Sequence, residues 1–292
     1  MPNNRFPIAL AHGIARFDIL REILVKQSGV PEIEFGDTLH YFKGIKSHLE
    51  RNGFEVHHTS VDFSGSVNRR AQQLSDQVKQ ILSGRSVDKV HIIAHSMGGL
   101  DARHMIVDIE GMEDKVASVT TIGTPHLGTS FADFGIKDGG ALFIKGVESV
   151  IDLGGFKDLT TEACGAFNLR AKDREARNRV VYRTYASSER RDLVFLPLQP
   201  SWEIIKQHEG ENDGLVSVKS QRWVSKLVAG NGPPKVVEQL AFPVAADHLN
   251  EVGWWDLQET NPILAFLKGR KLAEEFEGRI KQAYLEIARK LE

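Results

Sequence analysis

Residues 87–103 read Val-Asp-Lys-Val-His-Ile-Ile-Ala-His-Ser-Met-Gly-Gly-Leu-Asp-Ala-Arg, and this stretch decides the fold class. The β-branched run Val90–Ile93 predicts a buried strand, and the residues after the glycine pair predict a helix. Between them, Ala94-His-Ser-Met-Gly98 has the Gly-x-Ser-x-Gly spacing of a nucleophile elbow, with alanine at the first glycine position. Such a serine sits on a strained turn that tolerates only small neighbours. The pattern therefore predicts that Ser96 is a nucleophile beside a helix N-terminus.

The elbow pattern is short, so an alternative stays open at this point. A glycine-rich strand-to-helix turn in an ordinary α/β domain produces the same letters without any catalytic role. The rest of the chain has to supply the partners that a nucleophilic serine requires.

Composition restricts the class of protein. The chain has 292 residues, 41% of them hydrophobic and 26% charged, which is ordinary for a soluble globular protein. Its length suits one large α/β domain over residues 1–292, which we expect, with two small domains as the alternative. Its net charge of −2 gives no electrostatic basis for binding nucleic acid. No apolar stretch approaches the roughly 20 residues that span a bilayer, so no transmembrane segment is expected.

Cysteine content and the N-terminus bear on the cellular location. The single cysteine, Cys164, cannot form an intramolecular disulfide. Residues 1–10 lack the apolar run of a secretory signal. We expect a cytoplasmic protein, with export without a cleaved signal as the alternative.

The hydrophobic pattern alternates between strand and helix periods. We expect strands at residues 7–11, 54–59, 90–93, 116–122, 180–185 and 236–240, and helices at residues 38–50, 71–82 and 99–109. At the C-terminal end, Asn261-Pro262 is a helix start signal, and apolar residues recur at helical spacing from Leu272 to Leu291. This alternation predicts a mostly parallel sheet covered by helices, with the last helix packed against it.

Residues 128–168 depart from this alternation. Glycine-rich segments surround an amphipathic piece at residues 141–153. In a serine hydrolase, this is where a helical lid could be inserted over the active site. One more helix covering the sheet is the alternative.

A serine hydroxyl needs a histidine to take its proton and a carboxylate to orient that histidine. In this type of fold the three follow in the order serine, acid, histidine. Among the histidines beyond the serine, His126 comes too early and His208 precedes the best acid. His248 follows a strand-like stretch and lies in a loop, so we expect it to be the base.

The best candidate for the acid is Asp213. It lies in Glu-Asn-Asp-Gly-Leu-Val at residues 211–216, where a turn places a short carboxylate next to an apolar run. Asp192 and Asp247 are the rivals, and Asp247 should point away from its neighbour His248.

The negative oxygen of a tetrahedral intermediate needs two backbone N–H donors. One should be Met97, directly after the serine. The other should be Ile14, in the loop after the first strand, because Gly13 lets that backbone approach the substrate.

With these residues assembled, the chain resembles the bacterial triacylglycerol lipases, the true-lipase group of the α/β-hydrolase superfamily. The matching segments are Ala11–Asp18, Ala94–Leu100, Thr121–Gly128, Asn212–Ser217 and Asp247–Val252. The resemblance implies a Ser96–His248–Asp213 triad, an oxyanion hole at Ile14 and Met97, and a helical lid over residues 128–168. It also implies a lipid or ester substrate, met at an oil–water interface.

The chain departs from the family at two further positions. Many members hold a structural calcium with an aspartate two residues after the histidine, and this chain has Asn250 there. An amide oxygen carries no charge, so calcium has less reason to bind, although Asp192 falls near the family's other calcium aspartate. The cysteine pair of secreted relatives is also missing. We expect no required cofactor, with a weak calcium site as the alternative.

The predicted activity is hydrolysis of acylglycerol-type esters through an acyl-enzyme. The alternatives are a thioesterase or short-chain carboxylesterase for soluble acyl substrates, acyl transfer to an acceptor other than water, and a binding protein that has kept the fold without catalysis.

Overall fold

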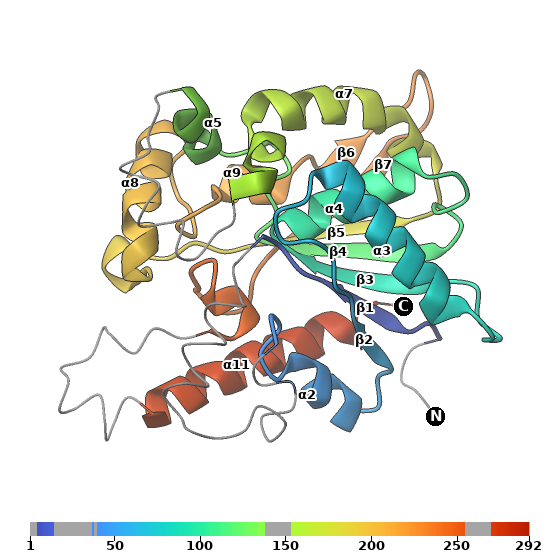
Figure 1. Cartoon of the computed structure of the whole chain (residues 1–292), viewed down its shortest axis with the longest axis horizontal. Coiled ribbons are helices and arrows are strands. Elements are labelled where there is room, and N and C mark those ends of the chain that lie inside the picture. The colour runs from blue at the N-terminus through green and yellow to red at the C-terminus, as the bar shows by residue number, and fades with distance from the viewer. Residues whose placement is uncertain (1–4, 15–36, 38–39, 138–152, 255–269, 292) are drawn as a thin grey trace.

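The computed structural model describes residues 5–14, 37, 40–137, 153–254 and 270–291. A seven-stranded sheet in the order β2-β1-β3-β4-β5-β7-β6 forms its centre (Figure 1). The strands are β1 (Ile8–Ala11), β2 (Val56–His58), β3 (Val90–His95), β4 (Val116–Ile122), β5 (Val181–Ala186), β6 (Lys226–Leu227) and β7 (Lys235–Ala241). All paired neighbours run parallel except β6, which is antiparallel to β7. The predicted mostly parallel sheet is confirmed.

Helices cover both faces of the sheet, and the strands are correspondingly apolar on both faces. Helices α3 (Val67–Leu82), α4 (Met97–Asp108) and α7 (Thr161–Arg177) lie on one side, and α2 (Ile45–Arg51) and α11 (Arg270–Ala288) lie on the other (Figure 1). Successive strand residues face opposite sides. In β1, Ile8 and Leu10 belong to the core under α11, while Ala9 and Ala11 belong to the core under α3 and α4.

Shorter elements gather beyond the carboxyl ends of the strands, where parallel α/β sheets place their ligands. They are α5 (Ser130–Lys137), η2 (Leu153–Leu159), η3 (Arg191–Leu193), η4 (Leu196–Leu198), α8 (Gln199–His208), α9 (Val218–Arg222) and η5 (Asn250–Val252). Phe131 of α5, Phe156 of η2 and Leu249 just before η5 line one pocket together with Ser96. The connections after β1, β3, β4, β5 and β7 supply the walls of this pocket.

The expected strands agree with the observed ones to within one or two residues, and the helices agree less well. The helix expected at 38–50 begins only at Ile45. Leu272 was expected on the packing face of the last helix, but its side chain is 47% exposed, whereas Phe276 and Ile280 are buried. Helices α7 and α8 were not predicted.

Two expected features fall largely outside the described residues. They are the Asn261-Pro262 start signal and the amphipathic piece at 141–153, of which only Leu153, the first residue of η2, is described. Within the part of the chain that the structure describes, no helix has the length and apolar character needed to cross a bilayer.

Candidate active site

The backbone at Ser96 has the strained geometry of an elbow. Ser96 has φ of 56° and ψ of −135°, a conformation that costs side chains of the L configuration free energy. The turn is held on both sides. The Ser96 N–H donates to the Ile122 carbonyl at 3.0 Å, and the Thr124 hydroxyl donates to the Ser96 carbonyl at 2.8 Å. The surrounding structure thus imposes the strain and fixes the direction of the serine side chain.

The small residues around Ser96 are needed because backbones approach closely. A Cβ on Gly98 would lie 2.4 Å from the Ala11 carbonyl oxygen, and one on Gly99 would lie 2.3 Å from the Thr124 hydroxyl. Ala94 is accommodated where the family has glycine because its partner on β1 is itself a small residue, Ala11. The departure at this position therefore leaves the elbow intact.

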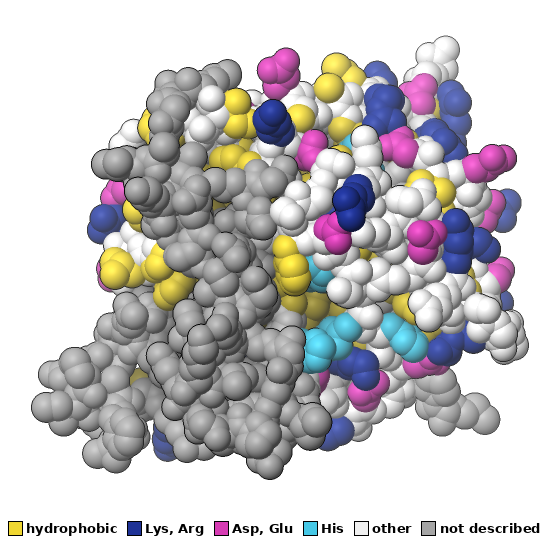
Figure 2. Space-filling model, in the orientation of Figure 1, with side chains coloured by type: hydrophobic (Ala, Val, Ile, Leu, Met, Phe, Trp, Pro, Cys, Tyr) yellow, Lys and Arg dark blue, Asp and Glu magenta, His cyan; other side chains and the backbone are white. Residues whose placement is uncertain are grey.

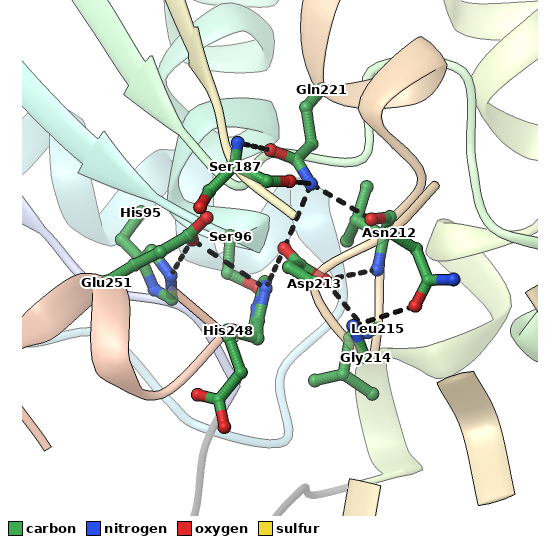
Figure 3. Close-up of polar contacts among 12 residues, drawn as sticks. His95, Ser96, Ser187, Asn212, Asp213, Gly214, Leu215, Gln221, His248 and Glu251 are labelled. Carbon is green, nitrogen blue, oxygen red and sulfur yellow. Dashed lines mark hydrogen bonds and ion pairs between the residues drawn. The ribbon is translucent and has the colours of Figure 1, made fainter. Parts of the chain in front are cut away.

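The predicted base and acid lie together. The Nδ1 of His248 lies 2.8 Å from Oδ2 of Asp213, and the His248 N–H donates to the Asp213 carbonyl at 2.9 Å. Ser96 and His248 line the same pocket, and Figure 3 shows the serine side chain directed toward the imidazole ring. The structure therefore brings Ser96, Asp213 and His248 together from three distant segments.

Asp213 is surrounded by hydrogen-bond donors. Its Oδ1 accepts the N–H groups of Leu215 and Val216 at 2.8 and 2.7 Å, and its Oδ2 accepts the side-chain amide of Gln221 at 3.1 Å. These donors stabilise a negative charge on a carboxylate that is otherwise fully buried. Gln221 was not predicted, because a glutamine on a short helix carries no sequence signal for this contact.

The two candidate oxyanion donors lie on either side of the serine. Met97 directly follows it as the first residue of α4, and Ile14 lines the pocket from the loop after β1. A Cβ on Gly13 would lie 2.6 Å from the Cβ of Ser96 and 3.0 Å from its Oγ. Glycine is therefore required there for the loop to reach the nucleophile.

The remaining pocket walls are mostly apolar. They are formed by Phe131, Phe156, Leu159, Leu215, Val216 and Leu249, with Pro125, Thr129 and Tyr41. Phe131 and Phe156 meet edge to face at 5.3 Å between ring centroids. Both belong to the segment 128–168 that was predicted as a lid, so its described part forms one wall of the pocket. Such a surface suits an acyl chain better than a polar ligand.

A second chain of polar groups adjoins the first, and it was not predicted. The Tyr41 hydroxyl lies 2.6 Å from Nδ1 of His95, and Nε2 of His95 lies 2.9 Å from Oε2 of Glu251 (Figure 3 shows the His95–Glu251 contact). Burial, together with nearby Asp213 and Asp247, raises the pKa of Glu251 well above its ordinary value. Burial lowers the pKa of His95 well below its ordinary value, and the neighbouring His248 adds to this. Both shifts favour the neutral forms of Glu251 and His95 in this hydrogen bond.

One ring nitrogen each of His95 and His248 and a carboxylate oxygen of Glu251 also lie close enough together to offer ligand atoms to a metal ion. Oε2 of Glu251 lies 2.9 Å from Nε2 of His95 and 4.0 Å from Nδ1 of His248. All three side chains are buried, and the nitrogen of His248 is already engaged by Asp213. Occupation by a metal would therefore compete with the contact that orients His248.

The rejected candidates have other partners. His126 is buried against the Thr121 hydroxyl and Arg103, and His208 is exposed at the end of α8. Asp192 is exposed and paired with Arg190. Asp247 points away from His248, as expected, and accepts three backbone N–H groups, from Phe195, Leu249 and Asn250.

The residues that the resemblance associates with calcium make other contacts in this structure. The Asn250 amide donates to the Trp254 carbonyl, so its side chain is committed to closing its own loop. Asp192 is held by Arg190 at the surface. The buried acid of this loop, Asp247, already has both oxygens engaged and ties the Phe195 segment to the His248 loop. These hydrogen bonds connect the two segments directly.

The chain is similar in sequence to known triacylglycerol lipases. A family profile described as PGAP1-like alpha/beta domain matches residues 40–137. Triacylglycerol lipase 2 of Saccharomyces cerevisiae is 33% identical over 196 residues, which are 63% of this chain and 57% of that protein. A triacylglycerol lipase of Pseudarthrobacter phenanthrenivorans is 37% identical over 133 residues, which are 44% of this chain and 36% of that protein.

Solved structures share the architecture. The lipase of Staphylococcus hyicus aligns with a TM-score of 0.59 and 18% identity over 97% of both chains. A metagenomic carboxyl esterase aligns with a TM-score of 0.62 and 17% identity over 97% of this chain and 76% of its own. The chain shares the α/β-hydrolase fold with these structures and is similar in sequence to triacylglycerol lipases. The fold class and the resemblance predicted from the sequence are thus confirmed. The match spans 57% of the length of the yeast relative and 36% of the length of the bacterial one.

Proposed function

We propose that this protein is a serine carboxylic ester hydrolase that cleaves acylglycerol-type esters through an acyl-enzyme. The observation that carries the proposal is the meeting of a strained, buried Ser96 with a His248–Asp213 pair in one apolar pocket. The relationship to triacylglycerol lipases supports ester hydrolysis as the reaction class.

The residues of the pocket account for every proton transfer in the reaction. Nδ1 of His248 is held by Asp213, so Nε2 takes the proton from the Ser96 hydroxyl as its oxygen attacks the ester carbonyl. The N–H groups of Ile14 and Met97 stabilise the oxyanion, and the imidazolium then gives its proton to the leaving alcohol. Water repeats the cycle on the acyl-enzyme and restores the serine. No cofactor takes part in these steps, and none is proposed.

A series of p-nitrophenyl esters with acyl chains of two to sixteen carbons tests the proposal. Wild type should hydrolyse them, and Ser96→Ala should lower kcat by about 10^6-fold, as removal of a nucleophile does. Full hydrolysis by Ser96→Ala would refute the mechanism. Repeating the series with emulsified substrate distinguishes a lipase, whose rate rises at the interface, from a short-chain esterase or thioesterase, whose rate does not.

A further inference from the structure

The imidazole of His12, which the mechanism does not use, joins two backbone groups. Its Nε2 accepts the N–H of Val61 at 3.1 Å, and its Nδ1 lies 2.8 Å from the Gly13 carbonyl oxygen. A ring nitrogen that accepts an N–H carries no proton. The single proton of the neutral ring is therefore on Nδ1, which donates to the Gly13 carbonyl.

The surroundings of His12 keep the ring neutral and fixed. Burial, with a smaller contribution from the Arg70 guanidinium, lowers the pKa of His12 to about 3. The ring packs against Phe63 and Tyr41, with centroid separations of 4.7 and 5.4 Å. One tautomer in one orientation is thus present throughout the neutral pH range.

The peptide that His12 holds is the one that carries a candidate oxyanion donor. The Gly13 carbonyl and the Ile14 N–H belong to the same planar trans peptide, so they point in opposite directions. A hydrogen bond that fixes the oxygen therefore also fixes the direction of the N–H. Because glycine has wide φ and ψ freedom, the peptide would otherwise be able to rotate.

The preceding peptide is held as well. Nη2 of the fully buried Arg70 donates to the His12 carbonyl at 2.8 Å, and the same guanidinium pairs with Asp101 on α4 at 2.7 Å. Helix α4 begins directly after Ser96. Arg70 thus holds the loop that carries Ile14 in a fixed position relative to the helix that carries Met97.

From this geometry we propose that His12 is a positioning residue that orients the Ile14 N–H toward the oxyanion by holding the Gly13 carbonyl. The inference rests on the proposed function. In this proposal the Nδ1–H group of His12 positions the Gly13 peptide, and the Val61 contact at Nε2 only selects the tautomer. The two ring nitrogens can be separated experimentally.

Two substitutions by an amide residue each replace one ring nitrogen of His12. In His12→Asn the amide nitrogen reaches the place of Nδ1 and can still donate to Gly13. In His12→Gln the amide reaches the place of Nε2 and keeps the Val61 contact but not the Gly13 contact. We expect H12N to keep kcat within about threefold, and H12Q to lose about 10- to 100-fold in kcat with KM within about threefold, a fraction of what a lost oxyanion donor costs. His91→Gln, which replaces a buried histidine bonded to Ser118 on the same sheet, is the matched control.

A transition-state analogue provides a second readout. A trifluoromethyl ketone forms an oxyanion with Ser96, so its inhibition constant should rise in H12Q by the same factor as kcat/KM falls. Equal losses in H12N and H12Q, or no loss in H12Q, would overturn the proposal while leaving ester hydrolysis by Ser96 in place. If both variants fail to fold, nitrogen-15 NMR of histidine in wild type decides, because a proton on Nε2 of His12 would equally overturn it. Activity retained in Ser96→Ala would instead reject the proposed function itself.

Discussion

Two chains of carboxyl, imidazole and hydroxyl groups run side by side in this site, and they differ in the surroundings of the carboxyl group. Asp213, which bonds to His248, also accepts two backbone N–H groups and the Gln221 amide. Glu251, which bonds to His95, has one oxygen that finds no hydrogen-bond partner in the described parts of the chain. Both carboxyl groups are buried.

The comparison shows that two equally buried carboxyl groups differ in the number of hydrogen-bond donors around them. A buried carboxylate keeps its charge when hydrogen-bond donors replace water, and it takes up a proton when they are absent. The chain through Asp213 is therefore equipped to stabilise a transient imidazolium. The chain through Glu251 connects Tyr41, β3 and η5 as a neutral support.

The largest test of this difference is Asp213→Asn. An amide at this position can no longer stabilise the imidazolium of His248 and favours the wrong tautomer, so kcat/KM should fall by about 10^4-fold. The measurement is hydrolysis of the best p-nitrophenyl ester at neutral pH. Glu251 lies 4.0 Å from Nδ1 of His248. A loss of only a few-fold would mean that Glu251 takes over as the acid, and the two chains would then not differ in this role.

A second test concerns how stability depends on pH. Glu251 has a pKa above its unfolded value of 4.5, so its contribution to stability is complete below pH 4.5 and is lost as pH rises toward the folded pKa. Glu251→Gln removes this loss. Its free energy of unfolding relative to wild type should increase with pH above about 4.5, by at most about 1.4 kcal/mol per pH unit.

Urea denaturation at pH 5, 6, 7 and 8 measures this effect. Glu110→Gln, at an exposed position, is the control and should give a constant difference from wild type. If the free-energy difference between Glu251→Gln and wild type is also constant from pH 5 to 8, the pKa of Glu251 is not raised. The contrast drawn with Asp213 would then be wrong.

The smallest effect is expected at the end of the neutral chain. Tyr41→Phe removes the hydroxyl that bonds to His95 and should cost about 1 kcal/mol of stability, with kcat within about threefold. Tyr284→Phe is a matched control, because the hydroxyl of Tyr284 is buried without a hydrogen-bond partner among the described residues, and its removal should cost nothing. A large fall in kcat at unchanged stability would place the Tyr41 hydroxyl in the reaction instead.

The sequence predicted those features that depend on local pattern. Strand periods, the elbow and the turn around Asp213 are short-range signals, and the order of motifs along the chain led to His248. The Glu251–His95 contact joins residues 156 positions apart, and Tyr41 lies 54 positions from His95. Such pairs depend on the folded sheet bringing loops together, and single residue types give no sign of them. Helix α7 was missed because its buried face is narrow, with Cys164, Phe167 and Ala171 among its few buried side chains.

The backbone angle at Ser96 also has an evolutionary consequence. A serine held at positive φ costs of order 1 to 3 kcal/mol, whereas glycine would adopt this turn with little cost. Selection for a stable chain and selection for turnover thus oppose each other at one position. A copy of this chain that no longer needed the hydroxyl would therefore gain stability by changing Ser96 to glycine.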